Sequence, residues 1–135
     1  MKNLLATSLL SVLLNGGDES KKLLEILQSK LESNQRFYAT SFSLLEILQT
    51  KKWMSFEDRR EFLQQSGILC EEIYPVTKED IQLYSDLIAG RTLEKGLELI
   101  ELAVSINRGM DALLVYGSSL ESERGVRIID LKSSA

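Results

Sequence analysis

The sequence predicts a single α/β domain over residues 1–135, with a mainly parallel sheet of four or five strands flanked by helices. Its length of 135 residues is that of one ordinary domain, and its 44% hydrophobic content suffices for one buried core. Short apolar segments alternate along the chain with amphipathic ones. Two of the apolar segments, ALLV and VRII, run almost without a break, which is typical of parallel strands buried on both faces.

The first half of the chain predicts two strands and four helices. The strands are expected at residues 3–7 and 37–41, and the helices at residues 8–15, 18–33, 41–54 and 55–67. Polar residues with short side chains mark the expected helix starts, because their oxygens accept from free backbone N–H groups. The expected caps are Ser8 for the first helix, Ser41 or Ser43 for the third, and Ser55 for the fourth. Gly67 is the expected stop of the fourth helix.

The second half predicts three more strands between further helices. A short strand lies within residues 68–76, and helices are expected at 77–90 and 93–109. Thr77 and Asp80 have the spacing of a capping box at the first of these helix starts. The remaining expectations are a strand at 111–117, a turn or short helix at 119–125, and a last strand at 126–131.

The residues that are missing restrict the chemistry. The chain has no histidine, which excludes histidine general bases, Ser-His-Asp triads and histidine metal sites. Its one cysteine, Cys70, lies in an apolar stretch and is expected in the core; one cysteine forms neither an intrachain disulfide nor a zinc cluster. Carboxylates remain, and they indicate either a hard cation such as Mg²⁺ or Mn²⁺, or no catalysis.

The charge and the amino-terminal segment bear on partners and location. A net charge of −4 counts against tight nonspecific binding of nucleic acid, although it leaves room for a local basic patch. Residues 4–20 imitate a secretion signal, but polar residues interrupt the run and LNGG is a poor cleavage site. No stretch reaches the roughly 18 apolar residues of a membrane span. We therefore expect a cytoplasmic protein without a membrane contact.

Ligands of parallel sheets bind beyond the carboxyl ends of the strands. In this chain those ends are expected at Ala6 and Thr7, at Thr40 and Ser41, and at Tyr116 and Gly117. Thr7 and Ser8 are candidate substrate contacts, and the alternative interpretation of both is helix capping. Any functional site is expected at this edge, together with a helix that passes over it.

Four segments, in order along the chain, resemble the PIN-domain family, small parallel α/β proteins that include the toxin ribonucleases of toxin–antitoxin pairs. They are LLATSLLSVLLNGGDES, TSFSLLEIL, YPVTKEDIQLYSDLI and RGMDALLVYGSSLESERGVRIIDL. The resemblance covers nearly the whole chain. It implies a site at which three or four carboxylates hold one or two Mg²⁺ or Mn²⁺ ions for phosphodiester cleavage.

Transferring the acidic positions of the family gives an incomplete set. The first falls on Ala6, the second on Glu46, the third on Glu98 and the fourth on Gly117. The resemblance thus leaves Glu46 and Glu98 as candidate catalytic and metal-binding residues, while Ala6 and Gly117 cannot bind an ion. Substitutes for the missing acids are Glu101, one helical turn from Glu98, and the more distant Asp18, Glu19 and Asp111. Asp111 is expected at the opposite end of its strand.

Each of these acids also has an ordinary interpretation. Glu46 fits a solvated position on an amphipathic helix, and Glu98 and Glu101 fit an exposed acidic stripe, which we favour for that pair. The leucine-rich helices at residues 22–31 and 44–54 carry more apolar surface than one sheet face needs. This surplus predicts a homodimer or a complex with a small antitoxin-like protein.

Three functions remain open from the sequence. The first is a PIN-like protein with a degenerate metal site that binds RNA weakly or binds a protein. The second is an active Mg²⁺- or Mn²⁺-dependent endoribonuclease, the toxin of a toxin–antitoxin pair. The third is an unrelated α/β interaction module. Convergence of residues 6, 46, 98 and 117 in one pocket would favour the first two.

Overall fold

A computed structural model describes residues 1–51, 54–89 and 96–132 of the chain. The sheet has five strands in the order β3-β2-β1-β4-β5, and every neighbouring pair is parallel, as predicted. The strands are β1 (Lys2–Leu5), β2 (Arg36–Thr40), β3 (Glu72–Tyr74), β4 (Ala112–Val115) and β5 (Arg127–Asp130).

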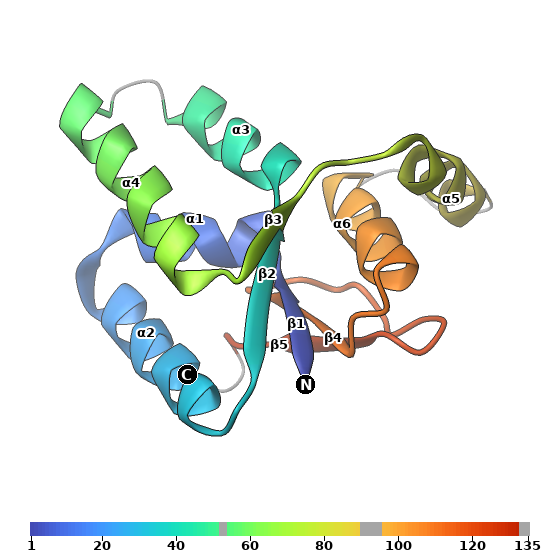
Figure 1. The fold of residues 1–135 in the computed structure, drawn as a ribbon, viewed down its shortest axis with the longest axis horizontal. Coiled ribbons are helices and arrows are strands. Elements are labelled where there is room, and N and C mark those ends of the chain that lie inside the picture. The colour runs from blue at the N-terminus through green and yellow to red at the C-terminus, as the bar shows by residue number, and fades with distance from the viewer. Residues whose placement is uncertain (52–53, 90–95, 133–135) are drawn as a thin grey trace.

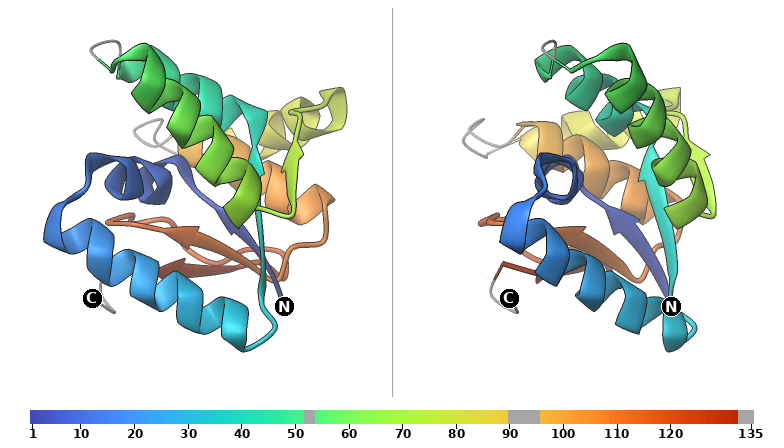
Figure 2. Two further views of the ribbon diagram at one scale, coloured as in Figure 1. Left: turned by 60° about the vertical axis from the view of Figure 1, so that its left-hand side comes forward. Right: turned by 90° about the vertical axis from the view of Figure 1, so that its left-hand side faces the viewer.

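Helices cover both faces of this sheet. They are α1 (Thr7–Asn15), α2 (Gly17–Glu32), α3 (Ser41–Thr50), α4 (Phe56–Leu69), α5 (Lys78–Ile88) and α6 (Gly96–Asn107). Helices α1 to α4 lie on one face, while α5 and α6 lie together on the other (Figures 1 and 2). Among the described residues, no helix is long and apolar enough to cross a membrane.

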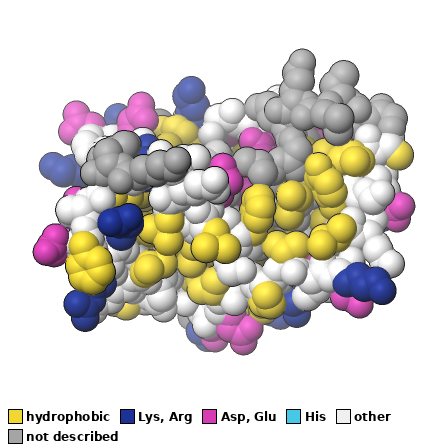
Figure 3. All heavy atoms as spheres, turned by 90° about the horizontal axis from the view of Figure 1, so that it is seen from above, with side chains coloured by type: hydrophobic (Ala, Val, Ile, Leu, Met, Phe, Trp, Pro, Cys, Tyr) yellow, Lys and Arg dark blue, Asp and Glu magenta, His cyan; other side chains and the backbone are white. Residues whose placement is uncertain are grey.

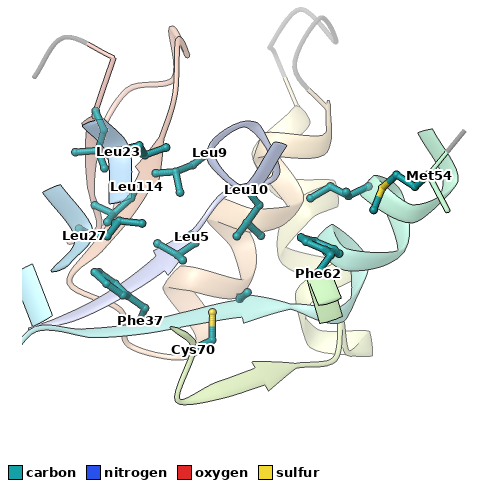
Figure 4. Close-up of a cluster of buried hydrophobic side chains, with 14 residues drawn as sticks. Leu5, Leu9, Leu10, Leu23, Leu27, Phe37, Met54, Phe62, Cys70 and Leu114 are labelled. Carbon is teal, nitrogen blue, oxygen red and sulfur yellow. The ribbon is translucent and has the colours of Figure 1, made fainter. Parts of the chain in front are cut away.

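The two layers explain why the strands are apolar without a break. Successive residues of a strand point to opposite faces, so a strand covered on both sides needs apolar residues at every position. In β4, Leu114 packs into the cluster under α1 to α4, whereas Leu113 and Val115 pack into the cluster under α5 and α6. Figure 4 shows the first cluster, in which Phe62 of α4 lies on the same side of the sheet as Leu10 of α1.

The register aligns the carboxyl ends of the three central strands. Leu4 of β1 is paired with Tyr38 of β2, and Leu5 with Leu114 of β4. Directly after β1, the N–H of Ala6 donates to the carbonyl oxygen of Leu114 at 2.9 Å. The chain therefore leaves β1, β2 and β4 at one edge of the sheet, where the sequence places its candidate site.

Two of the predicted helix caps are confirmed. Ser55 accepts from the N–H of Asp58 at 3.1 Å at the start of α4. Thr77 and Asp80 form a reciprocal capping box at the start of α5. Asp80 is almost fully buried and also accepts from Asn107 Nδ2 at 2.9 Å, so this cap ties α5 to α6.

The other two predicted caps are wrong. Helix α3 is capped by Thr40, whose hydroxyl oxygen accepts from the N–H of Ser43, and not by Ser41 or Ser43. Helix α1 begins one residue earlier than predicted, and its N-cap Ala6 offers no side-chain acceptor. Ser8 instead accepts from the N–H of Tyr116 at 3.1 Å, because the start of α1 packs against the end of β4.

The ends of two helices also differ from the expectations. Helix α4 continues past Gly67 to Leu69, since a single glycine in a helix costs only about 1 kcal/mol. Helix α3 ends at Thr50, before the predicted end at Met54. Residues 52–53 lie outside the described part of the chain, as do Gly90 and the predicted helix start at 93–95. The segment 119–125, predicted as a turn or short helix, contains a turn at Arg124 and Gly125, between the residues of an isolated antiparallel bridge that joins Glu123 and Val126.

Candidate functional site

Glu101 of α6 is the only acid among the predicted or substitute site residues that lies fully buried within the described structure. Its Oε2 accepts from the N–H of Thr7 at 2.7 Å and from the hydroxyl of Ser43 at 3.2 Å. Helix α6 thereby reaches the first residue of α1 and the first turn of α3. The expectation that Glu101 belongs to an exposed acidic stripe is wrong.

Hydroxyl groups extend this contact into α3. The Thr40 and Ser43 hydroxyl oxygens lie 2.9 Å apart, and the N–H of Ser43 donates to Thr40 Oγ1 at 3.0 Å. Both residues are completely buried. Two polar atoms at the same place, Glu101 Oε1 and Thr7 Oγ1, make no hydrogen bond with the described residues. Buried polar atoms are rarely without a hydrogen-bond partner, so two such atoms at one place are unusual.

The same environment raises the pKa of the Glu101 carboxyl to about 8. Burial is the main cause, because it penalises the charged form. Hydrogen bonding from Thr7 and Ser43 lowers the pKa, and the neighbouring Glu98 adds to the rise. Glu101 is therefore mostly an uncharged acid at neutral pH.

Glu98, the predicted ligand one turn earlier on α6, is half-buried. Its Oε2 accepts from the hydroxyl of Ser118, which follows Gly117 in the chain. The Ser118 hydroxyl oxygen also accepts from the N–H of Leu120 at 3.0 Å. Glu98 therefore lies near the end of β4, as the resemblance implies, but a loop hydroxyl engages one of its oxygens.

Glu46, the other predicted ligand, lies half-exposed on α3. Its backbone carbonyl oxygen accepts from Thr50 Oγ1 at 3.0 Å. No hydrogen bond links its carboxylate to Glu98 or Glu101 in the described structure. The role of Glu46 in a metal site stays a prediction.

The two positions without a carboxylate lie at the sheet edge. Ala6 is completely buried at the start of α1, so its methyl group packs in the core. Gly117 has a φ of +74°, and its N–H donates to Asp130 Oδ1 at 2.9 Å. A Cβ atom at Gly117 would lie 3.5 Å from Lys132 Cδ and 3.9 Å from Lys132 Nζ. The fourth family position therefore faces a basic side chain.

The remaining predicted residues lie apart from Glu101 or serve the fold. Thr7 and Ser8 use a backbone N–H and a side chain, respectively, in bonds to Glu101 and Tyr116, so their role as substrate contacts stays a prediction. Asp111 Oδ2 accepts from the N–H of Lys2 at 2.7 Å, at the opposite edge of the sheet. Asp18 is exposed in the first turn of α2.

A divalent ion requires several anionic oxygens that converge on it. Within residues 1–51, 54–89 and 96–132, no group of three or more acidic or cysteine side chains is placed to hold a metal ion. At the strand ends, Glu101 is bonded through Oε2 to Thr7 and Ser43, and Asp130, the last residue of β5, accepts from the N–H of Gly117. The described residues therefore do not fit a magnesium or manganese centre.

The comparisons with known proteins identify the fold. No protein-family model matches the sequence, and no curated protein matches it. A chain of VapBC2 from Rickettsia felis, in a crystal structure bound to a DNA fragment from their promoter, is similar with a TM-score of 0.71 and 16% identity, over 96% of this chain and 98% of that chain. VapC20 of Mycobacterium tuberculosis, a toxin that cleaves the sarcin–ricin loop, is similar with a TM-score of 0.62 and 14% identity, over 87% and 91%.

At these identities the likeness concerns the fold alone. It confirms the expected PIN-type α/β architecture, which is the fold of the VapC toxins. The third interpretation, an α/β interaction module whose likeness to the family is only topological, is not tested by a likeness of fold.

Proposed function

We propose that this chain is a PIN-fold protein that binds a protein partner and has lost metal-dependent RNA cleavage. The observation that carries the proposal is the acid set at the sheet edge. Ala6 and Gly117 offer no ligand, and the described acids do not form a group of three. In a protein without histidine, metal activation of water is the chemistry that this fold would use for phosphodiester cleavage.

The energetic argument concerns the transition state. A divalent ion contributes several kcal/mol by stabilising developing charge on the phosphate, and each 1.4 kcal/mol is about tenfold in rate. Glu98 is hydrogen-bonded to Ser118, and Glu101 is held mainly in its uncharged form at neutral pH. Two such carboxyl groups provide too little binding free energy to offset the dehydration of Mg²⁺. We therefore expect RNA cleavage to be slower than that of an active relative by several powers of ten.

The outer surfaces of α3 and α4 support the second half of the proposal. Apolar side chains there remain exposed; they are Leu45 (65%), Phe56 (65%), Leu63 (45%) and Ile68 (72%). Figure 3, which views the molecule from above the helices of Figure 1, shows hydrophobic side chains exposed on both halves of this side, with the largest group toward the half that carries α5 and α6. We call these four residues the α3–α4 apolar face. Several large apolar side chains exposed on neighbouring helices are a feature of protein interfaces.

The proposed partner is a small antitoxin-like protein. The support is the likeness of the fold to VapBC2, whose structure was solved bound to DNA from their promoter, together with the α3–α4 apolar face. A homodimer through the same face, an RNA ligand bound without cleavage, and a cytoplasmic location all stay predictions.

The loss of cleavage is tested with a mixed RNA substrate and Mn²⁺. We expect no cleavage above background by the parent and no saturable Mn²⁺ binding in calorimetry. The double variant Ala6→Asp with Gly117→Asp should bind Mn²⁺ more tightly. Stoichiometric Mn²⁺ binding and cleavage by the parent, both abolished by Glu46→Gln, would instead establish an active endoribonuclease.

Partner binding is tested by co-expression with the protein encoded by the reading frame next to this gene. Leu45→Lys combined with Ile68→Lys should abolish a copurifying complex, because two charges would be buried in the interface. Leu24→Lys is the matched control: Leu24 is 43% exposed on α2, and α1 lies between α2 and α3. Equal loss of the complex in both variants would refute the assignment of the surface, and light scattering would report a homodimer.

A further inference from the structure

One carboxyl group joins three helices at the edge of the sheet. Glu101 projects from α6, accepts from the first N–H of α1 and accepts from a hydroxyl in the first turn of α3. Fully buried acids are rare in proteins unless they have a specific partner. The partners of Glu101 are neutral donors, so the usual charge pairing does not explain its position.

The start of α1 gives a reason for an acceptor at this place. The first N–H groups of a helix have no partner within the helix and need an external acceptor. Ala6 occupies the N-cap position and provides none through its side chain. The Glu101 oxygen satisfies the N–H of Thr7 at 2.7 Å from another helix. A residue 94 positions away in the sequence thus supplies part of the missing cap.

The start of α3 leads to the same oxygen. Thr40 caps α3 by accepting from the N–H of Ser43, and the two hydroxyl oxygens lie 2.9 Å apart. Ser43 then donates to Glu101 Oε2 at 3.2 Å. The starts of α1 and α3 therefore share a single acceptor on α6, and Thr40, Ser43 and Glu101 are fully buried.

We propose that Glu101 is a positioning residue that clamps the starts of α1 and α3 to α6, and that this hydrogen-bonded clamp takes the place of a metal centre at the sheet edge. In a metal centre, an ion with acidic ligands would hold these helix starts together. In this chain one carboxyl group holds them. The raised pKa of Glu101 agrees with this role, because an uncharged acid still accepts at Oε2. The inference rests on the proposed absence of a metal site and is independent of the partner.

The competing assignment makes Glu101 a ligand. Its Oε1 and the nearby Thr7 Oγ1 have no hydrogen-bond partner in the described structure, which a cation or a water molecule bound between them would explain. A clamp and a ligand respond differently to glutamine. An amide retains a carbonyl oxygen that accepts from Thr7 and Ser43, but it carries no charge for a cation.

The experiment compares the melting temperatures of the parent, Glu101→Gln and Glu101→Leu at neutral pH, with Glu98→Gln as the control on the same helix. A clamp predicts that Glu101→Gln melts at or above the parent temperature, because the amide keeps the acceptor and, unlike the acid, takes up no proton on folding at neutral pH. Glu101→Leu leaves two donors unpaired and should melt about 5–10 °C below Glu101→Gln. If Glu101→Leu does not fold, Ser43→Ala takes its place. The clamp predicts that Ser43→Ala lowers the melting temperature, and by the same amount in the parent as in Glu101→Gln.

The same melts are repeated with Mn²⁺ as the probe. The clamp predicts no shift for the parent or for either Glu101 variant. A rise in the parent that Glu101→Gln abolishes would overturn the inference, as would a loss in Glu101→Gln as large as that in Glu101→Leu. RNA cleavage without a Mn²⁺ shift would refute the proposed function and leave the clamp in place, so the two failures are distinguishable.

Discussion

Replacing Glu101 by glutamine should remove a pH dependence from the stability of the fold. The folded-state pKa of Glu101 is about 8, against 4.5 for an ordinary glutamate. Between these two values the folded chain binds a proton that the unfolded chain has released. Stability therefore decreases as pH rises through this window, and the contribution is lost once pH passes the folded-state value.

The magnitude follows from the width of the window. The difference of 8 − 4.5 is 3.5 pH units, and each unit corresponds to about 1.4 kcal/mol. The parent should therefore lose up to about 5 kcal/mol of unfolding free energy from this group between acidic and mildly basic pH. Entry of water or a small movement of α6 would reduce the loss, so about 5 kcal/mol is its upper limit.

Urea unfolding of the parent and Glu101→Gln at about pH 5 and about pH 8 measures the effect, because these values bracket most of the window. Other carboxylates titrate in both proteins, so the difference between the two curves isolates Glu101. Glu98→Gln should keep the pH dependence, because it leaves the buried acid in place. Parallel stabilities of the parent and Glu101→Gln across this range would refute the reasoning.

Three further predictions concern other parts of the chain. Gly117→Asp alone should gain less Mn²⁺ affinity in calorimetry than Gly117→Asp with Lys132→Ala, because Lys132 lies against the position of the new side chain. Asp80→Ala should lower the melting temperature and cost about 2–3 kcal/mol, because the buried Asp80 accepts from both Thr77 and Asn107. Burial raises the pKa of the Cys70 thiol to about 12, so Ellman's reagent should react with it only as fast as the protein unfolds.

The layers of the fold could be predicted because the burial of a strand is visible in its own few residues. Residues such as Leu113 and Leu114 are apolar at consecutive positions, which requires cover on both faces of the sheet. The capping box of Thr77 and Asp80 was predicted for the same reason, since both partners lie within four residues. Patterns that are complete within one element can be recognised in one sequence.

The role of Glu101 depends on elements far apart in the sequence and was not predicted. An acid one turn from Glu98 fits a solvated stripe, and only the packing of α6 against the start of α1 reverses that interpretation. One local signal was present: Glu101 is flanked by Leu99, Ile100, Leu102 and Ala103, so a solvated position there is surrounded by apolar neighbours. The capping of α1 by a residue of α6 follows no short sequence spacing, so the sequence alone does not predict it.

The connection between Ala6 and Glu101 can be tested by restoring an acid at position 6. Aspartate is a favourable N-cap and normally adds about 1 kcal/mol to a helix. Here Ala6 is fully buried, and Glu101 already accepts from the first N–H of α1. Two buried carboxyl groups at one helix start cannot both ionise without a large cost. Ala6→Asp should therefore destabilise the parent.

Above about pH 8, where Glu101 of the parent is ionised, the same substitution should cost less in Glu101→Gln, because the amide has no charge that opposes a second carboxylate. A double-mutant cycle measures this coupling, which for groups in one network amounts to about 0.5–3 kcal/mol. Equal effects of Ala6→Asp in both backgrounds would show that the two positions are independent. If Mn²⁺ then stabilises Ala6→Asp but not Ala6→Asp with Glu101→Gln, the carboxyl that clamps the parent becomes a ligand once a second acid is present. On this reasoning, Glu101 acts as a clamp because position 6 carries an alanine and no second acid.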